Sequence, residues 1–242
     1  MLNISLKEWK QFFTSLTGYL ALCLFLLLTG LILFVFPDTS ILDMGYATLA
    51  GFFNIAPWLL IFMVPTITMR SFSEEKRLGT LETLTTRPVS DLGIILGKYL
   101  AGVSLLLIAL LPTLIYYYSI SQLGNPVGNV DTGAMWGSYL GLIFLGMAYT
   151  AMGVFSSAVT DNQIVALILS MALGFFFYVV LGMMGDITAL DAIGKSLEWF
   201  SLEYHYDSIS RGVLDTRDVL YMLSFSALFI GLTKTVFESR KW

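Results

Sequence analysis

The sequence predicts an all-α integral membrane protein with six transmembrane helices. Of its 242 residues, 57% are apolar and only 12% are charged, about half the charged share of a typical soluble domain. The mean hydropathy is +0.79, and long stretches contain no Asp, Glu, Lys or Arg. Such a chain has too few charges to cover a water-facing surface, and its hydrophobicity excludes intrinsic disorder.

Six apolar runs are long enough to cross a membrane, because a helix needs about 20 residues to span ~30 Å of hydrocarbon. We expect the spans at 16–36, 49–69, 99–120, 135–159, 164–185 and 219–237. These runs do not alternate apolar and polar residues, which excludes a β-barrel. The first run is longer than the apolar core of a signal peptide and lacks a small-x-small cleavage site, so we expect it to remain attached.

Residues 1–15 show helical periodicity before the first span. One stripe carries Leu2, Leu6, Trp9, Phe13 and Leu16, and another carries Asn3, Lys7, Lys10 and Thr14. This spacing predicts an amphipathic helix that lies in the membrane interface. A frayed terminal tail is the alternative.

The distribution of Lys and Arg predicts that both termini are cytoplasmic. With the N-terminus inside, three of the 13 basic residues fall in outer segments, namely Lys195, Arg211 and Arg217, and the other ten fall in inner segments. Basic residues are concentrated in cytoplasmic loops of membrane proteins. The chain has no long basic run, which argues against a nucleic-acid partner.

Segment 70–98 is the longest charged stretch on the predicted inner side. Ser71 and Glu74 fit a capping box, and the pattern predicts a short amphipathic helix over 72–84. Its apolar side carries Leu78, Leu81 and Leu84. Gly79 weakens a helix by about 1 kcal/mol relative to Ala, so we expect it to permit close backbone contact.

Segment 186–218 is too long for a simple turn on the predicted outer side. It contains Trp199, Phe200, Tyr204 and Tyr206, and this density of aromatic residues favours interfacial or re-entrant helices. We see no internal repeat and expect residues 1–242 to form a single membrane domain.

The sequence contains no motif for catalysis, a cofactor or a metal. The nearest match to the P-loop G-x-x-x-x-G-K-[ST] is 93–99, which is one residue short and ends in Tyr99. Glu203, His205 and Asp207 would share a face in a strand but diverge in a helix, and there is no second histidine. We therefore expect no catalytic, cofactor-binding or metal site.

Two features of the spans leave alternatives open. Gly137 and Gly141 form a G-x-x-x-G motif, which favours either packing inside the bundle or a dimer contact. Asn54 and Pro57 break the second span, so this helix could line a translocation path or simply pack.

Residues 74–84, followed by 87–89 and 97–99, resemble the permease subunits of type-2 ABC exporters. Residues 211–219, just before the last span, share this resemblance. It covers essentially the whole chain and is closest to the permease of the gliding-motility-associated ABC transporter.

The resemblance implies a permease of the bacterial inner membrane, surrounded by lipid. It implies a separate ATPase subunit that binds ATP and Mg, and a second permease chain, identical or paralogous. This chain itself would bind no cofactor. The residues implied in contact with the ATPase subunit are Phe72, Glu74, Glu75, Leu78, Gly79, Thr80, Leu81, Glu82 and Leu84.

Two functions are compatible with such a chain. The first is the permease of an ATP-driven exporter, which couples ATP hydrolysis to substrate movement and serves gliding motility. The alternative is a membrane scaffold or mechanical transmitter that the ATPase subunit drives without a transported substrate. An intramembrane enzyme is disfavoured by the missing catalytic groups.

Overall fold

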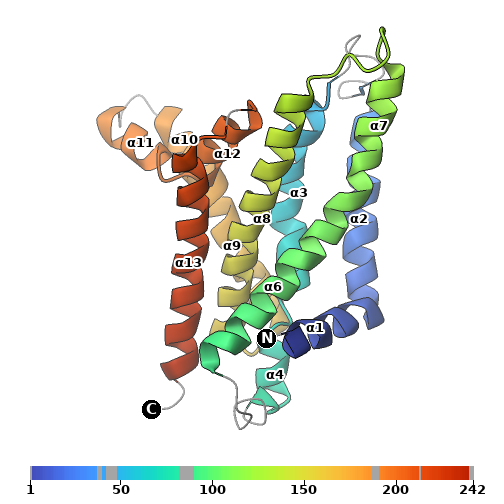
Figure 1. Ribbon diagram of the computed structural model, residues 1–242. Helices are drawn as coiled ribbons and strands as arrows, with labels where there is room; N and C mark the ends of the chain where they lie inside the picture. Colours follow the sequence, from blue (N-terminus) through green and yellow to red (C-terminus); the bar gives the residue numbers. More distant parts are fainter. Residues whose placement is uncertain are drawn as a thin grey trace.

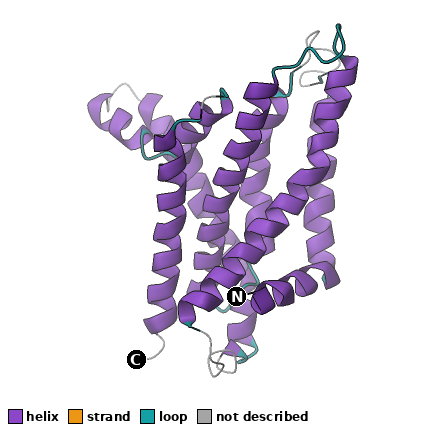
Figure 2. Ribbon diagram, viewed as in Figure 1, coloured by secondary structure: helices purple, strands orange, loops and turns teal. Residues whose placement is uncertain are grey.

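The computed structural model describes residues 2–36, 40–41, 48–81, 90–186, 191–212 and 214–239. Within these ranges all regular secondary structure is helical (Figure 2). Six helical segments are long and apolar enough to cross a membrane. The predicted fold class is therefore confirmed.

The six spans follow the predicted apolar runs closely. They are α2 (Leu16–Phe34), α3 (Ala50–Thr68), α6 (Asp91–Leu110) continued by η1 (Leu111–Thr113) and α7 (Leu114–Leu123), α8 (Thr132–Val159), α9 (Gln163–Phe175) continued by the π-helical η2 (Phe176–Val180) and α10 (Leu181–Met183), and α13 (Thr216–Ser239). The shorter elements are α1 (Leu2–Thr14), α4 (Ser73–Arg77), η3 (Met184–Asp186), α11 (Asp191–Glu198) and α12 (Leu202–Ser210). The break at η1 coincides with Pro112, which cannot donate a backbone hydrogen bond inside a helix.

The short helices lie at the two ends of the bundle (Figure 1). Helix α1 crosses one end, next to α4, and the last turn of α13 lies at this same end. Helices α10, α11 and α12 lie at the opposite end. We refer to these as the α4 end and the α12 end.

Helix α8 is the central helix of the bundle. It contacts α3, α6, α9, α12 and α13 and is the most buried of the six spans. Small residues on α8 let neighbouring helices approach closely. At Gly153 a Cβ atom would lie 2.0 Å from the Thr68 hydroxyl of α3, so α3 and α8 could not keep this spacing with a larger residue.

Two spans begin earlier than the sequence predicted and thereby take in a charged residue. Helix α6 starts at Asp91 instead of 99, and α13 starts at Thr216 instead of 219. Both extra turns contain a buried charge, Lys98 in α6 and Asp218 in α13. We expected both residues to lie in loops outside the spans, but Lys98 Nζ lies 2.6 Å from Glu8 Oε1 and Asp218 Oδ1 lies 2.7 Å from His205 Nδ1.

Candidate functional site

Helix α4 ends in a glycine cap. The Thr80 N–H donates to Glu75 O at 3.0 Å and the Gly79 N–H donates to Lys76 O at 3.1 Å, the two bonds of a Schellman motif. Gly79 has a φ of +67°, which favours glycine. The helix predicted over 72–84 is therefore interrupted, because α4 covers Ser73–Arg77 and ends before Gly79, while residues 82–84 lie outside the described residues. Within this chain a Cβ at Gly79 would meet no atom within 4 Å, so any close contact there would have to be with another protein and stays a prediction.

The start of α4 is held by a serine from α8. The Ser157 hydroxyl accepts the N–H groups of Phe72 at 2.9 Å and Ser73 at 3.0 Å, and it donates to Met69 O at 3.0 Å. The predicted capping box of Ser71 and Glu74 is wrong, since no side chain of the segment caps α4. A distant hydroxyl pairs the free N–H groups of this helix start instead.

A second attachment to α8 lies at the end of α4. The Lys76 ammonium donates to Ala158 O in the last turn of α8. Helix C-termini carry unpaired carbonyl groups and partial negative charge, which favours a lysine there. Both ends of α4 are thus bound to the same end of α8.

The apolar side chains around α4 divide between the inside of the chain and its surface. Phe72 and Leu81 are buried in a cluster with Phe237 of α13, whose ring lies 5.3 Å from that of Phe72. Leu81 is 7% exposed, whereas Leu78 is 61% exposed. The three leucines therefore do not form the single outward face that we expected. Glu82 and Leu84 lie outside the described residues.

Lys98 is the centre of an ion-pair network at the α4 end. Its side chain is fully buried, and its Nζ lies 2.6 Å from Glu8 Oε1 of α1 and 3.0 Å from Glu75 Oε2 of α4. The same nitrogen donates to Ser71 O and lies 4.9 Å from the centroid of the Phe72 ring, within the range of a cation–π contact. The bonds of Lys98 therefore join α1, α4 and α6.

Two further contacts strengthen the link between α1 and α4. Lys7 Nζ lies 2.6 Å from Glu75 Oε1, and the Gln11 amide donates to Glu74 Oε2 at 2.8 Å. We predicted that Glu74 and Glu75 would meet a partner protein, but the structure uses both carboxylates inside this chain. We call Lys7, Glu8, Glu75 and Lys98 the lysine network.

The lysine network was missed in the sequence analysis. The available signal was Lys98 itself, because a lysine beside a long apolar run requires a partner. Its partners could not be identified from sequence, since Glu8 lies 90 positions away and the pair of Lys7 and Glu75 is 68 positions apart.

The exposed part of this region is a short turn, residues 77–80. Arg77, Leu78, Gly79 and Thr80 are all exposed. Of the predicted contact residues in the described chain, Leu78, Gly79 and Thr80 are thus accessible to another protein. Phe72, Glu75 and Leu81 hold the turn in place from inside.

Asn54 and Pro57, the residues of the candidate translocation path, differ in their exposure in the structure. Asn54 is exposed and lines a cavity of about 160 Å³ at the α12 end, whereas Pro57 is buried. Pro57 has no N–H to donate to Phe53 O, and the buried Tyr206 hydroxyl donates to that carbonyl at 2.8 Å. Burial raises the pKa of Tyr206 well above its ordinary value, which keeps its hydroxyl protonated as a donor.

Gly137 and Gly141 face α12 of the same chain. A Cβ on Gly137 would lie 2.8 Å from Gly212 Cα, and one on Gly141 would lie 3.3 Å from Ile209 and Tyr206 side-chain atoms. Both glycines therefore serve packing inside the chain, where α8 meets α12.

His205 joins α12 to α13. Its Nδ1 lies 2.7 Å from Asp218 Oδ1 and its Nε2 lies 2.9 Å from Trp199 O. Glu203 and Asp207 point elsewhere on α12 and line a polar hollow with Arg211. In the described part of the chain, no three His, Cys, Asp or Glu residues are grouped to hold a metal ion.

Comparison with known families agrees with this architecture. The family model described as "ABC-2 family transporter protein" matches residues 43–239, which is most of the chain. The chain belongs to the ABC-2 transporter family. No curated protein matches the sequence.

Membership in the ABC-2 transporter family supports a permease component of an ABC transporter, with an ATPase partner in general. The matched residues include α3, α4, α6 and all later helices, while α1 precedes them. The lysine network therefore connects a helix outside the family match to two helices inside it.

Proposed function

We propose that this ABC-2 family chain is the permease subunit of an ATP-driven exporter, and that a separate ATPase subunit docks on residues 77–80. The observation that carries this proposal is the exposed turn itself. An accessible leucine lies at the tip of an element that is attached to three helices.

A force applied to residues 77–80 would reach several spans. Helix α4 continues directly from α3, is bonded to α8 through Ser157 and Lys76, and is joined to α6 and α1 through Lys98. Rigid secondary structure and bonded side chains can transmit motion, whereas a loop without such bonds would absorb it. We therefore infer that α4 moves together with α1, α3, α6 and α8.

ATP and Mg would be bound by the partner. In the segment nearest to a P-loop, residues 93–99, the chain is helical and the lysine is buried between two carboxylates. A phosphate-binding lysine must instead be free to reach a nucleotide. This arrangement supports a permease that depends on another subunit for ATP hydrolysis.

The remaining parts of the proposal follow the sequence resemblance. A second permease chain, identical or paralogous, would complete the transporter. The transporter would lie in the bacterial inner membrane. Gliding motility is the process in which we propose that this exporter acts.

Co-purification with the ATPase subunit tests the docking site. Leu78→Asp should lower the amount of ATPase subunit recovered with the permease several-fold, because burial of one leucine contributes roughly 1.5–3 kcal/mol. Leu214→Asp is the matched control, since Leu214 is 50% exposed at the α12 end and should leave recovery unchanged. Recovery of the ATPase subunit at wild-type level with Leu78→Asp would refute the proposed contact.

A further inference from the structure

Arg70 is a cation without a partner in the described structure. It follows the end of α3, and its Nε atom is buried and makes no hydrogen bond to any described residue. The neighbouring cations differ, because Lys7, Lys76 and Lys98 are each bonded to a carboxylate or a carbonyl. A buried guanidinium nitrogen without an acceptor is costly, so Arg70 requires an anionic ligand.

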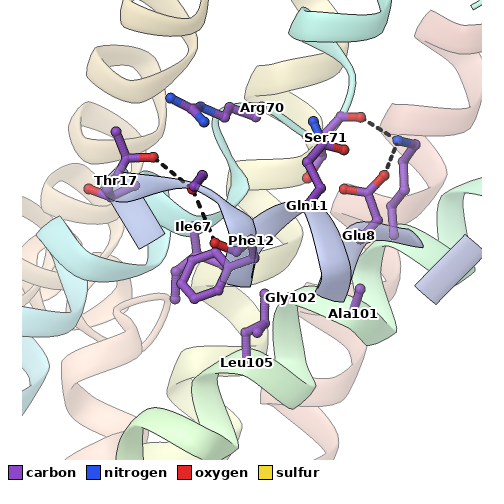
Figure 3. Close-up of a pocket in the computed structure, with 13 residues that line it drawn as sticks. Glu8, Gln11, Phe12, Thr17, Ile67, Arg70, Ser71, Ala101, Gly102 and Leu105 are labelled. Carbon is purple, nitrogen blue, oxygen red and sulfur yellow. Dashed lines mark hydrogen bonds and ion pairs between the residues drawn. The ribbon is translucent and has the colours of Figure 1, made fainter. Parts of the chain in front are cut away.

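The side chain of Arg70 lines a small cavity between α1, α2, α3 and α6. The cavity measures about 30 Å³ and is also lined by the hydroxyls of Ser15, Thr17 and Thr66. Figure 3 shows the guanidinium of Arg70 directed toward the side of Thr17 and away from Glu8. Glu8 lies at the far side, where Lys98 neutralises it.

We propose that this cavity binds the phosphate group of a membrane phospholipid. The Arg70 guanidinium would hold two phosphate oxygens, because its fork of N–H donors matches that geometry. The Thr17 hydroxyl, now bonded to Ser15 at 3.1 Å, can rotate to donate a third bond. The cavity has room for phosphate oxygens only, so the rest of the ligand must lie outside it.

The surface beside the cavity favours a lipid over free phosphate. Helix α2 starts there and exposes Leu16, Leu20, Leu24 and Leu27 along one side. On α3, Phe62 is exposed one turn from Thr66. Acyl chains could follow this apolar column while the headgroup phosphate occupies the cavity, since membrane helices present such surfaces to lipid.

The position of this site gives it a structural consequence. The lipid would lie against α1 at its junction with α2, next to the lysine network. A bound phospholipid would therefore fix α1 to the α4 end of the span bundle. The proposal is independent of the docking proposal, because the binding test uses the permease chain alone.

Native mass spectrometry of the delipidated full chain tests the site. The probes are phosphatidylglycerol, a diacylglycerol with the same acyl chains but no phosphate, and inorganic phosphate. We expect phosphatidylglycerol to bind in preference to the other two probes. Arg70→Gln should weaken this binding roughly tenfold, which corresponds to about 1.4 kcal/mol.

Two variants complete the test. Arg77→Gln removes an exposed arginine of the same end and should leave binding unchanged, and Thr17→Val should weaken binding without changing any charge. The elution volume and the circular dichroism of each variant establish that it is folded. Should Arg70→Gln fail to fold, Thr17→Val decides the outcome.

Three results would overturn the proposal. The first is wild-type binding of phosphatidylglycerol by folded Arg70→Gln, or by Thr17→Val where Arg70→Gln does not fold. The second is equal binding of the diacylglycerol, which would leave no role for the phosphate. The third is displacement of the lipid by millimolar inorganic phosphate, which would assign the cavity to a free anion.

Discussion

Lys98 shows how a single buried charge can organise one end of this permease. Its ammonium contacts carboxylates from two other helices, and the whole side chain is excluded from solvent. In a buried pair each charge depends on its partner, since the loss of one leaves the other uncompensated. Lys98 is therefore more sensitive to substitution than any surface lysine of the chain.

We expect Lys98→Gln to lower the free energy of unfolding by about 3 kcal/mol, because it leaves the partly buried Glu8 carboxylate without its cation. Lys234→Gln is the control. Lys234 and Glu238 form an exposed pair at 3.6 Å, and its loss should cost about 0–0.5 kcal/mol. Chemical unfolding of both variants in detergent measures the difference, and equal stability of the two would contradict the role of Lys98.

Asp207 gives the protein a pH dependence that the sequence did not predict. Although Asp207 is exposed, desolvation by the surrounding protein raises the pKa of its carboxyl above the ordinary value, and the nearby Arg211 opposes the shift. A raised folded-state pKa means that the folded state keeps its proton to higher pH than the unfolded state. The contribution of Asp207 to stability is therefore largest at acid pH and falls as the carboxyl ionises.

The difference in melting temperature between the wild type and Asp207→Asn measures this effect. As pH rises from about 4, the ordinary value of an aspartate, the wild type should lose stability relative to the variant. The difference should become constant once Asp207 is ionised in the folded state as well. A wild type that gains stability over Asp207→Asn across this interval would reverse the sign and contradict the raised pKa of the carboxyl.

At the scale of elements, local patterns predicted the spans but not α4. The spans follow from runs without charge, and each such run can be recognised from its own stretch of sequence. The length of α4 depends on a positive φ at Gly79 and on the hydroxyl of Ser157, which is 85 positions from Phe72. A leucine repeat cannot reveal either, so the predicted helix was too long and Leu81 was assigned to the wrong side.

The attachment of α4 to α8 can be tested at Ser157. Ser157→Ala would leave the N–H groups of Phe72 and Ser73 without an acceptor, at a cost of about 1–3 kcal/mol for each buried group. Ser156→Ala is a matched neighbour, since among the described residues its hydroxyl bonds only to Met152 O of its own helix. Amide hydrogen exchange should become faster over 72–77 in Ser157→Ala and stay unchanged in Ser156→Ala; unchanged exchange in both would exclude this attachment.

At the scale of the whole molecule, the sequence predicted the architecture better than the site. Composition and charge-free runs suffice for six spans, and the amphipathic start matches α1. The α4 end is assembled from segments around residues 8, 75, 98 and 157, and their meeting depends on how the bundle packs. The contact with an ATPase subunit therefore stays a prediction, and the division of its residues into buried and exposed came only from the structure.

The orientation of the bundle is a further prediction at this scale. The excess of basic residues at the α4 end predicts that this end is cytoplasmic. In a Cys23→Ser background, Val127→Cys at the opposite end should react with an impermeant thiol reagent added outside the cell. Thr80→Cys should react only after the membrane is opened, and external labelling of Thr80→Cys would invert the topology.

The central claim is that residues 77–80 form the contact with an ATPase subunit. A photo-cross-linking amino acid placed at position 78 in native membranes tests it most directly, with position 214 as the control. We predict an adduct at position 78 whose partner, identified by mass spectrometry, carries a P-loop, and no such adduct at position 214. An ATPase adduct at position 214 with none at position 78 would contradict the account.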